Sequence, residues 1–165
     1  MNKLLPIGAI AAALITATPP IPPHTGEPDV RIMGMKAVLY FEGDASLSSF
    51  DVMQDGPEAP SLWNTSAGEG AAAGKASNAT LVLVLVSGPR GSLWKATLHL
   101  TASDGTRRVA DRLIPLQPFS FGTPSVWIPI ILYGTGCAKL GVTAAIREAP
   151  SQLAVTKTVP FRCGE

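Results

Sequence analysis

Between residues 92 and 103 the chain alternates regularly between apolar and polar positions. The apolar positions are Trp94, Ala96, Leu98 and Leu100. The polar positions between them are Lys95, Thr97, His99 and Thr101. Because successive side chains of a strand point to opposite faces, this period of two predicts a β-strand with one buried and one solvated face.

A hairpin is predicted directly after this strand. Asp104-Gly105 offers the backbone dihedrals that a two-residue turn needs, and RRVADRLIPL (107–116) supplies the returning strand. If Ser103 pairs with Thr106 across this turn, Val109 and Leu113 lie on the buried face, which is interrupted only by Asp111.

The preceding segment, TLVLVLVS (80–87), is a run of β-branched residues and leucines of strand length. GPRG (88–91) follows it as a turn signal. Pairing Ser87 with Ser92 would add this strand to the hairpin, so the sequence predicts a three-stranded meander with one continuous apolar face. A slip of one residue would bury a lysine and a histidine, which specifies the register.

Three further segments precede the meander. Residues 30–42 predict one or two strands with a bend at Gly34, and residues 46–53 predict another short strand. The composition of residues 54–79 predicts a long loop.

The apolar segment 123–134 contains two prolines, Pro124 and Pro129, which cannot donate to a sheet ladder. It is therefore predicted to be an edge or bulged strand. No segment has a helical period over four turns. Seven or eight short strands separated by turn signals predict an all-β fold, an antiparallel β-sandwich.

Both cysteines, Cys137 and Cys163, frame the last predicted hairpin. Pairing them directly puts the apolar faces of the two strands out of phase by one residue, which predicts a β-bulge near Lys139 or Gly141. Alternatively, Cys137 lies in the entering loop, or the bond joins non-adjacent strands. An even number of cysteines in an exported chain predicts one C-terminal disulfide. The wide spacing favours a structural staple over a redox pair.

The N-terminus has the pattern of an export signal. Lys3 is followed by an apolar stretch, and Ala17 is a suitable last residue before cleavage, so residues 1–17 are predicted to be a signal peptide. The apolar stretch is too short for a retained membrane anchor, which needs ~20 residues. Residues 18–28 form a proline-rich spacer, and residues 29–165 form a single domain. The predicted location is periplasmic or extracellular, with no stable membrane span after cleavage.

The charge balance excludes some partners. Charged residues make up 15% of the chain, with 13 basic and 12 acidic side chains. Removal of Lys3 with the signal peptide leaves 12 of each. A neutral chain without a basic run lacks the electrostatic footprint of a nucleic-acid-binding protein.

Candidate catalytic residues are few. The chain has two histidines, His24 and His99, which is too few for an ordinary transition-metal site, so neither metal nor cofactor is predicted. His99 is the only credible general base, and no nucleophile motif accompanies it. Asp51, Asp55 and Glu58 form the nearest approach to an acidic cluster, without calcium-loop spacing. The sequence predicts a non-enzyme.

A set of aromatic residues falls outside the regular alternation and forms the candidate interface: Trp63, Phe119, Phe121, Trp127 and Tyr133. Aromatic side chains between turn residues can form a recognition patch. The alternative is that they plug the open ends of the sandwich.

From Val30 to Cys163, the strand count, the alternation and the cysteine pair resemble the secreted immunoglobulin-like β-sandwiches. The chain departs from the immunoglobulin pattern because both cysteines are C-terminal and no tryptophan lies between them. The resemblance implies a fold and does not transfer a function.

Two functional hypotheses follow. The first is a non-catalytic exported binding or assembly module that contacts another envelope or extracellular protein through an edge strand or the aromatic loops. The second is a small carbohydrate-active or hydrolytic envelope enzyme that uses His99 or the Asp51/Asp55/Glu58 loop.

Overall fold

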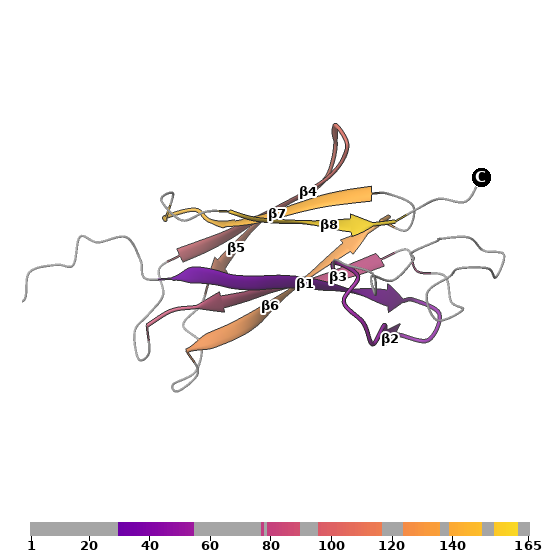
Figure 1. Ribbon diagram of the computed structural model, residues 1–165, viewed down its shortest axis with the longest axis horizontal. Helices are drawn as coiled ribbons and strands as arrows, with labels where there is room; N and C mark the ends of the chain where they lie inside the picture. Colours follow the sequence, from indigo (N-terminus) through magenta and orange to yellow (C-terminus); the bar gives the residue numbers. More distant parts are fainter. Residues whose placement is uncertain are drawn as a thin grey trace, which may run out of the picture.

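A computed structural model describes residues 30–54, 77, 79–89, 96–116, 124–135, 139–149 and 154–161. Within these residues the chain forms eight strands in two antiparallel four-stranded sheets, and it forms no helix. Figure 1 shows the two sheets as stacked layers. The predicted all-β antiparallel sandwich is confirmed.

The first sheet has the order β2-β1-β3-β6. Its strands are β1 (Arg31–Phe41), β2 (Ser46–Leu47), β3 (Ala79–Ser87) and β6 (Ser125–Tyr133). The second sheet has the order β5-β4-β7-β8. Its strands are β4 (Ala96–Asp104), β5 (Arg107–Leu116), β7 (Lys139–Ile146) and β8 (Val155–Pro160).

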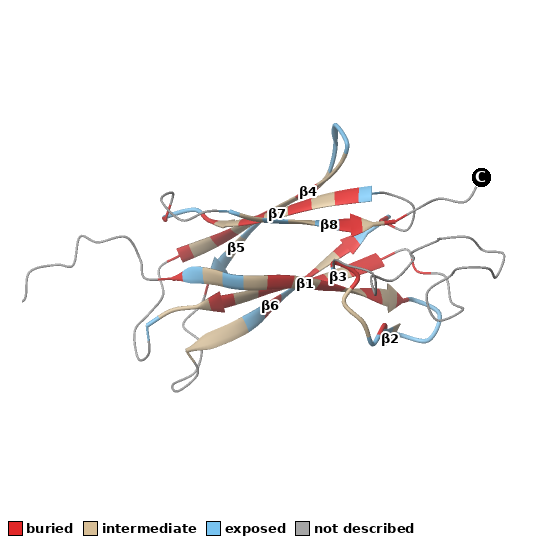
Figure 2. Ribbon diagram, viewed as in Figure 1, coloured by how far each residue is buried: buried red, intermediate tan, exposed pale blue. Residues whose placement is uncertain are grey.

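The core lies between the sheets and is built by every second residue of the central strands, as the alternation of buried and intermediate residues in Figure 2 shows. Val82 and Val84 of β3 and Leu98 and Leu100 of β4 are fully buried. Burying a side chain of this size stabilises a fold by about 1.5–3 kcal/mol. The predicted inward positions of β4 are therefore confirmed where the structure describes them.

The β4–β5 hairpin is confirmed, with a different turn. Asp104 pairs with Arg107, so Gly105-Thr106 forms the two-residue turn. Gly105 adopts φ +55°, which the lack of a Cβ permits.

A bulge between Ala102 and Ser103 then shifts the register of β5. As a result Leu113 lies opposite His99 on the outer face and is 52% exposed, whereas Ile114 lies opposite Leu98 on the inner face. The prediction that Leu113 belongs to the buried face was wrong, because the bulge moves the inner face of β5 onto the neighbouring positions. Val109, which lies at the bulge, is partly buried and packs against the core.

The predicted pairing of β3 with β4 was also wrong. β3 pairs with β1 and β6 in the first sheet, and Ser87 lies opposite Ser125. Just beyond β3, the Gly88 N–H donates to the Pro124 carbonyl at 3.0 Å. The chain crosses to the other sheet after this point, so residues 80–87 form a central strand of one sheet and not the first strand of a meander.

Residues 31–41 form one strand, and the bend predicted at Gly34 corresponds to a register irregularity between Ile32 and Gly34. The strand predicted at 46–53 is confined to Ser46–Leu47. Beyond it the chain follows the edge of β1, where the Ser48 N–H donates to the Leu39 carbonyl at 3.0 Å.

The predicted edge position of β6 is confirmed, and its pairing with β3 is regular. β7 and β8 form the predicted C-terminal hairpin. Lys139 pairs with Pro160 and the register continues without a shift to Ala144 and Val155. The predicted bulge near Lys139 or Gly141 was wrong, because this register already aligns the apolar faces. Cys137 and Cys163 lie outside the described residues.

Candidate functional site

The outer face of the first sheet is apolar. Its outward positions on β1, β3 and β6, read from the strand register, carry a set of large apolar side chains that we term the apolar face: Val38, Tyr40, Leu81, Leu83, Leu85, Trp127, Pro129, Ile131 and Tyr133. Antiparallel sheets that face water on one side usually place polar residues there. The apolar face is therefore a candidate contact surface.

The second sheet has an ordinary polar outer face. Its outward positions include Thr97, His99, Thr101, Ser103, Asp111, Thr143, Thr156 and Thr158. The Thr143 and Thr156 hydroxyls share a hydrogen bond of 3.0 Å between β7 and β8. The apolar surface thus belongs to one sheet and is not a general property of the molecule.

Lys36 is the one charged residue in the central part of this face. This part comprises the outward positions of β1 from Gly34 to Tyr40 and the residues level with them on β3 and β6. Its ammonium nitrogen lies 4.7 Å from the centroid of the Trp127 ring. Since β3 separates β1 from β6, the two side chains meet above the leucines of β3. A cation over an indole is a favourable arrangement, and it leaves Trp127 41% exposed.

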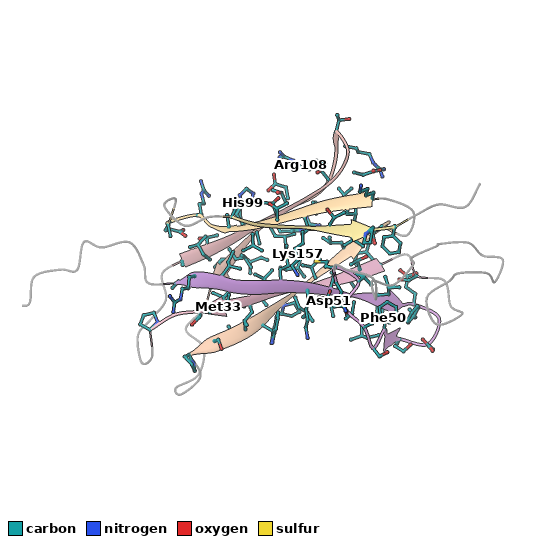
Figure 3. All side chains as sticks on the ribbon, viewed as in Figure 1. Met33, Phe50, Asp51, His99, Arg108 and Lys157 are labelled. Atoms are coloured by element: carbon teal, nitrogen blue, oxygen red, sulfur yellow. The ribbon has the colours of Figure 1, made fainter. Side chains whose placement is uncertain are left out.

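The edge strands β5, β6 and β8 each carry a feature that opposes the addition of another strand. Arg112 of β5 and Lys157 of β8 occupy inward positions opposite Leu100 and Val142, and Figure 3 places Lys157 between the layers. Pro129 interrupts the donors of β6. Inward charges and edge prolines are devices that block edge pairing. They favour the apolar face over an edge strand as the contact surface.

Asp51 has a structural position beside β1 (Figure 3). Its Oδ1 accepts hydrogen bonds from the backbone N–H groups of Ala37 and Met53, each at 2.9 Å. This oxygen therefore satisfies two main-chain donors at the edge of the sheet. Its predicted partners, Asp55 and Glu58, lie outside the described residues.

His99 lies in an exposed ion-pair network. Its Nε2 is 2.8 Å from Asp111 Oδ1, and the Arg108 guanidinium donates to Asp111 Oδ2 at 2.7 Å. The hydrogen bond from His99 and the charge of Arg108 lower the pKa of the Asp111 carboxyl. The neighbouring Thr97 hydroxyl donates to Glu148 at 2.8 Å, so it is directed away from the imidazole.

Two of the predicted interface aromatics belong to the apolar face. Trp127 and Tyr133 are 41% and 65% exposed and lie at opposite ends of the outward side of β6. Trp63, Phe119 and Phe121 lie outside the described residues. The aliphatic part of the face, on β1 and β3, was not among the predicted site residues. The sequence feature that pointed to it was the apolar run at residues 80–87, because a strand with apolar residues on both faces lacks the alternation with polar residues.

In the described ranges, no three His, Cys, Asp or Glu side chains lie close enough to hold a metal ion. The same ranges contain no helix that is long and apolar enough to cross a membrane.

No protein-family model matches the chain, and no curated protein matches it.

Proposed function

We propose that the protein is a non-catalytic, exported binding or assembly module with immunoglobulin-like architecture, and that it contacts another envelope or extracellular protein through the apolar face. The observation that carries this proposal is the contrast between the two outer faces. One sheet exposes threonines and ion pairs, and the other exposes leucines, an isoleucine, a tryptophan and two tyrosines. Large apolar patches on soluble domains mark interaction sites.

The order of the strands supports the immunoglobulin-like architecture. Two sheets of antiparallel strands are joined by crossings after β3, β5 and β6, and two hairpins lie in the second sheet. Constant-type immunoglobulin domains also divide their strands between two packed sheets in this interleaved manner. The fifth strand of this chain, β5, pairs with β4 and not with the first sheet.

The composition of the apolar face supports a protein as partner. Trp and Tyr are enriched at the centres of protein interfaces, where each can bury a large area. The export signal predicted at residues 1–17 supports a partner in the envelope or outside the cell.

A pull-down from the envelope or secreted fraction tests the proposal. Trp127→Ala removes the largest side chain of the face, and Leu113→Ala removes an exposed apolar side chain from the opposite sheet. The proposal predicts that a stoichiometric protein partner is lost with Trp127→Ala and retained with Leu113→Ala. Equal retention by both folded variants would exclude the apolar face. A function lost with His99→Ala, with binding intact, would instead support the enzyme hypothesis.

A further inference from the structure

We infer that the partner on the apolar face is a second copy of this chain, packed face to face. The two copies are related by a two-fold axis that lies between their apolar faces and runs perpendicular to the strands. This inference rests on the proposed function, because it uses the same face. It adds the identity of the partner and the register in which the two copies meet.

The charges at the two ends of β1 are complementary under this symmetry. Arg31 is exposed and begins the strand at an outward position, opposite Ser87. Glu42 is exposed and directly follows the strand at its other end. A two-fold axis across the strands makes the two β1 strands antiparallel. Each Arg31 then meets the Glu42 of the other copy, and the interface gains two equivalent ion pairs at its rims.

The same register brings apolar side chains of the two copies together. The cross-strand pairs, including the irregularity between Ile32 and Gly34, fix which residues of β1, β3 and β6 lie at one level. When Arg31 is level with Glu42 of the other copy, Leu83 is level with Leu81 of that copy. On β6, Trp127 is level with Tyr133 of the other copy, so the two rings face each other across the interface.

Lys36 is compatible with this packing. Its ammonium group extends over β3 to the indole of Trp127, which lies two residues along β6 from the position level with Lys36, toward the end marked by Arg31. The two-fold axis carries the second Lys36 toward the opposite end, so the two ammonium groups diverge. The aliphatic stem of each lysine can add to the apolar surface while the charge stays against its own ring.

The size of the face indicates a weak dimer. Three to four strands at their usual spacing and about nine residues of length give a face of roughly 15–19 Å by roughly 30 Å. The pair would bury about 1,000 Å² in total, which is at the lower limit for a specific interface. We therefore expect self-association in the micromolar range and an equilibrium with the monomer.

Sedimentation equilibrium between about 1 and about 200 μM tests the inference with a charge exchange, on protein produced from the full-length gene. Arg31→Glu and Glu42→Arg each place like charges at both rims, and each should weaken the dimer about tenfold, because two pairs are reversed at once. The double variant Arg31→Glu/Glu42→Arg restores opposite charges and should return the dissociation constant to within about threefold of the original. Both side chains are exposed, so the core is not altered.

Three outcomes overturn the inference. These are a monomer at the highest concentration, a dimer insensitive to the single reversals, and a double variant no better than the single ones. A monomer whose capture of another protein is still lost with Trp127→Ala would refute the second copy and leave the proposed function standing. If Trp127→Ala changes neither dimerisation nor capture, the proposed function fails as well.

Discussion

The ammonium group of Lys36 on β1 lies 4.7 Å above the ring of Trp127 on β6, although β3 separates the two strands. The pair therefore bridges the width of the sheet on its outer side. It orients the largest side chain of the apolar face and covers part of the leucine row beneath it. This relationship links the stability of the sheet to the shape of its proposed contact surface.

Replacing Lys36 should weaken the sheet and release Trp127. Lys36→Ala is expected to lower the free energy of unfolding by about 0.5–1 kcal/mol, which is the usual contribution of an exposed cation–π pair. Lys36→Arg should keep most of it, since a guanidinium also stacks on indole. Urea unfolding followed by circular dichroism measures both. Equal stability of the alanine variant and the original protein would show that the contact contributes nothing.

Thr80 and Thr135 form a buried hydroxyl pair, with their Oγ1 atoms 2.9 Å apart and both residues fully buried. Thr80→Val removes one hydroxyl and is expected to cost about 1–3 kcal/mol, because the other hydroxyl loses its best partner. The double variant Thr80→Val/Thr135→Val should recover part of this loss. Denaturant midpoints of the three variants supply the measurement, and an additive double variant would contradict the coupling.

Asp51 should prove structural. Asp51→Ala removes the acceptor for two main-chain donors, those of Ala37 and Met53, and is expected to lower the free energy of unfolding by about 2–4 kcal/mol. Asp51→Asn retains an acceptor oxygen and should cost less than half as much. Thermal unfolding compares the two. A catalytic Asp51 would show the opposite pattern: full stability of the alanine variant together with a lost activity.

The ion-pair network around Asp111 predicts that the stability of the protein depends on pH. Its pKa is lowered from the ordinary value of 3.8, chiefly by the hydrogen bond from His99, so the folded state favours the ionised carboxylate. This contribution to stability is therefore present above that ordinary value and is lost as the pH falls through the lower folded-state pKa. The difference in Tm between the protein and Asp111→Asn should shrink as the pH is lowered from about 6 to about 3. A difference that does not change over this range would mean that the ion pair does not contribute.

Local patterns predicted much of the fold. The alternation in β4 fixed its inner face, and Pro124 and Pro129 correctly predicted the edge position of β6. Both signals act within one strand. They need no knowledge of the rest of the chain.

Pairing between strands was harder to predict. The turn signal after Ser87 is also compatible with a crossing between sheets, and only the packing of both faces of β3 decides between them. The bulge at Ala102/Ser103 leaves no local signal either, yet it exchanges the exposed and buried positions of β5. In the same way, the aliphatic part of the apolar face emerges only when β1, β3 and β6 lie side by side.

Site-specific photo-crosslinking in the producing cells tests the central claim, that the apolar face binds a protein. A photoreactive amino acid replaces Ile131 in the face, and the same residue at Leu113 on the opposite sheet serves as the control. A protein-binding apolar face predicts a discrete protein adduct from position 131 and none from position 113. No adduct from position 131, or the same adduct from both positions, would contradict it.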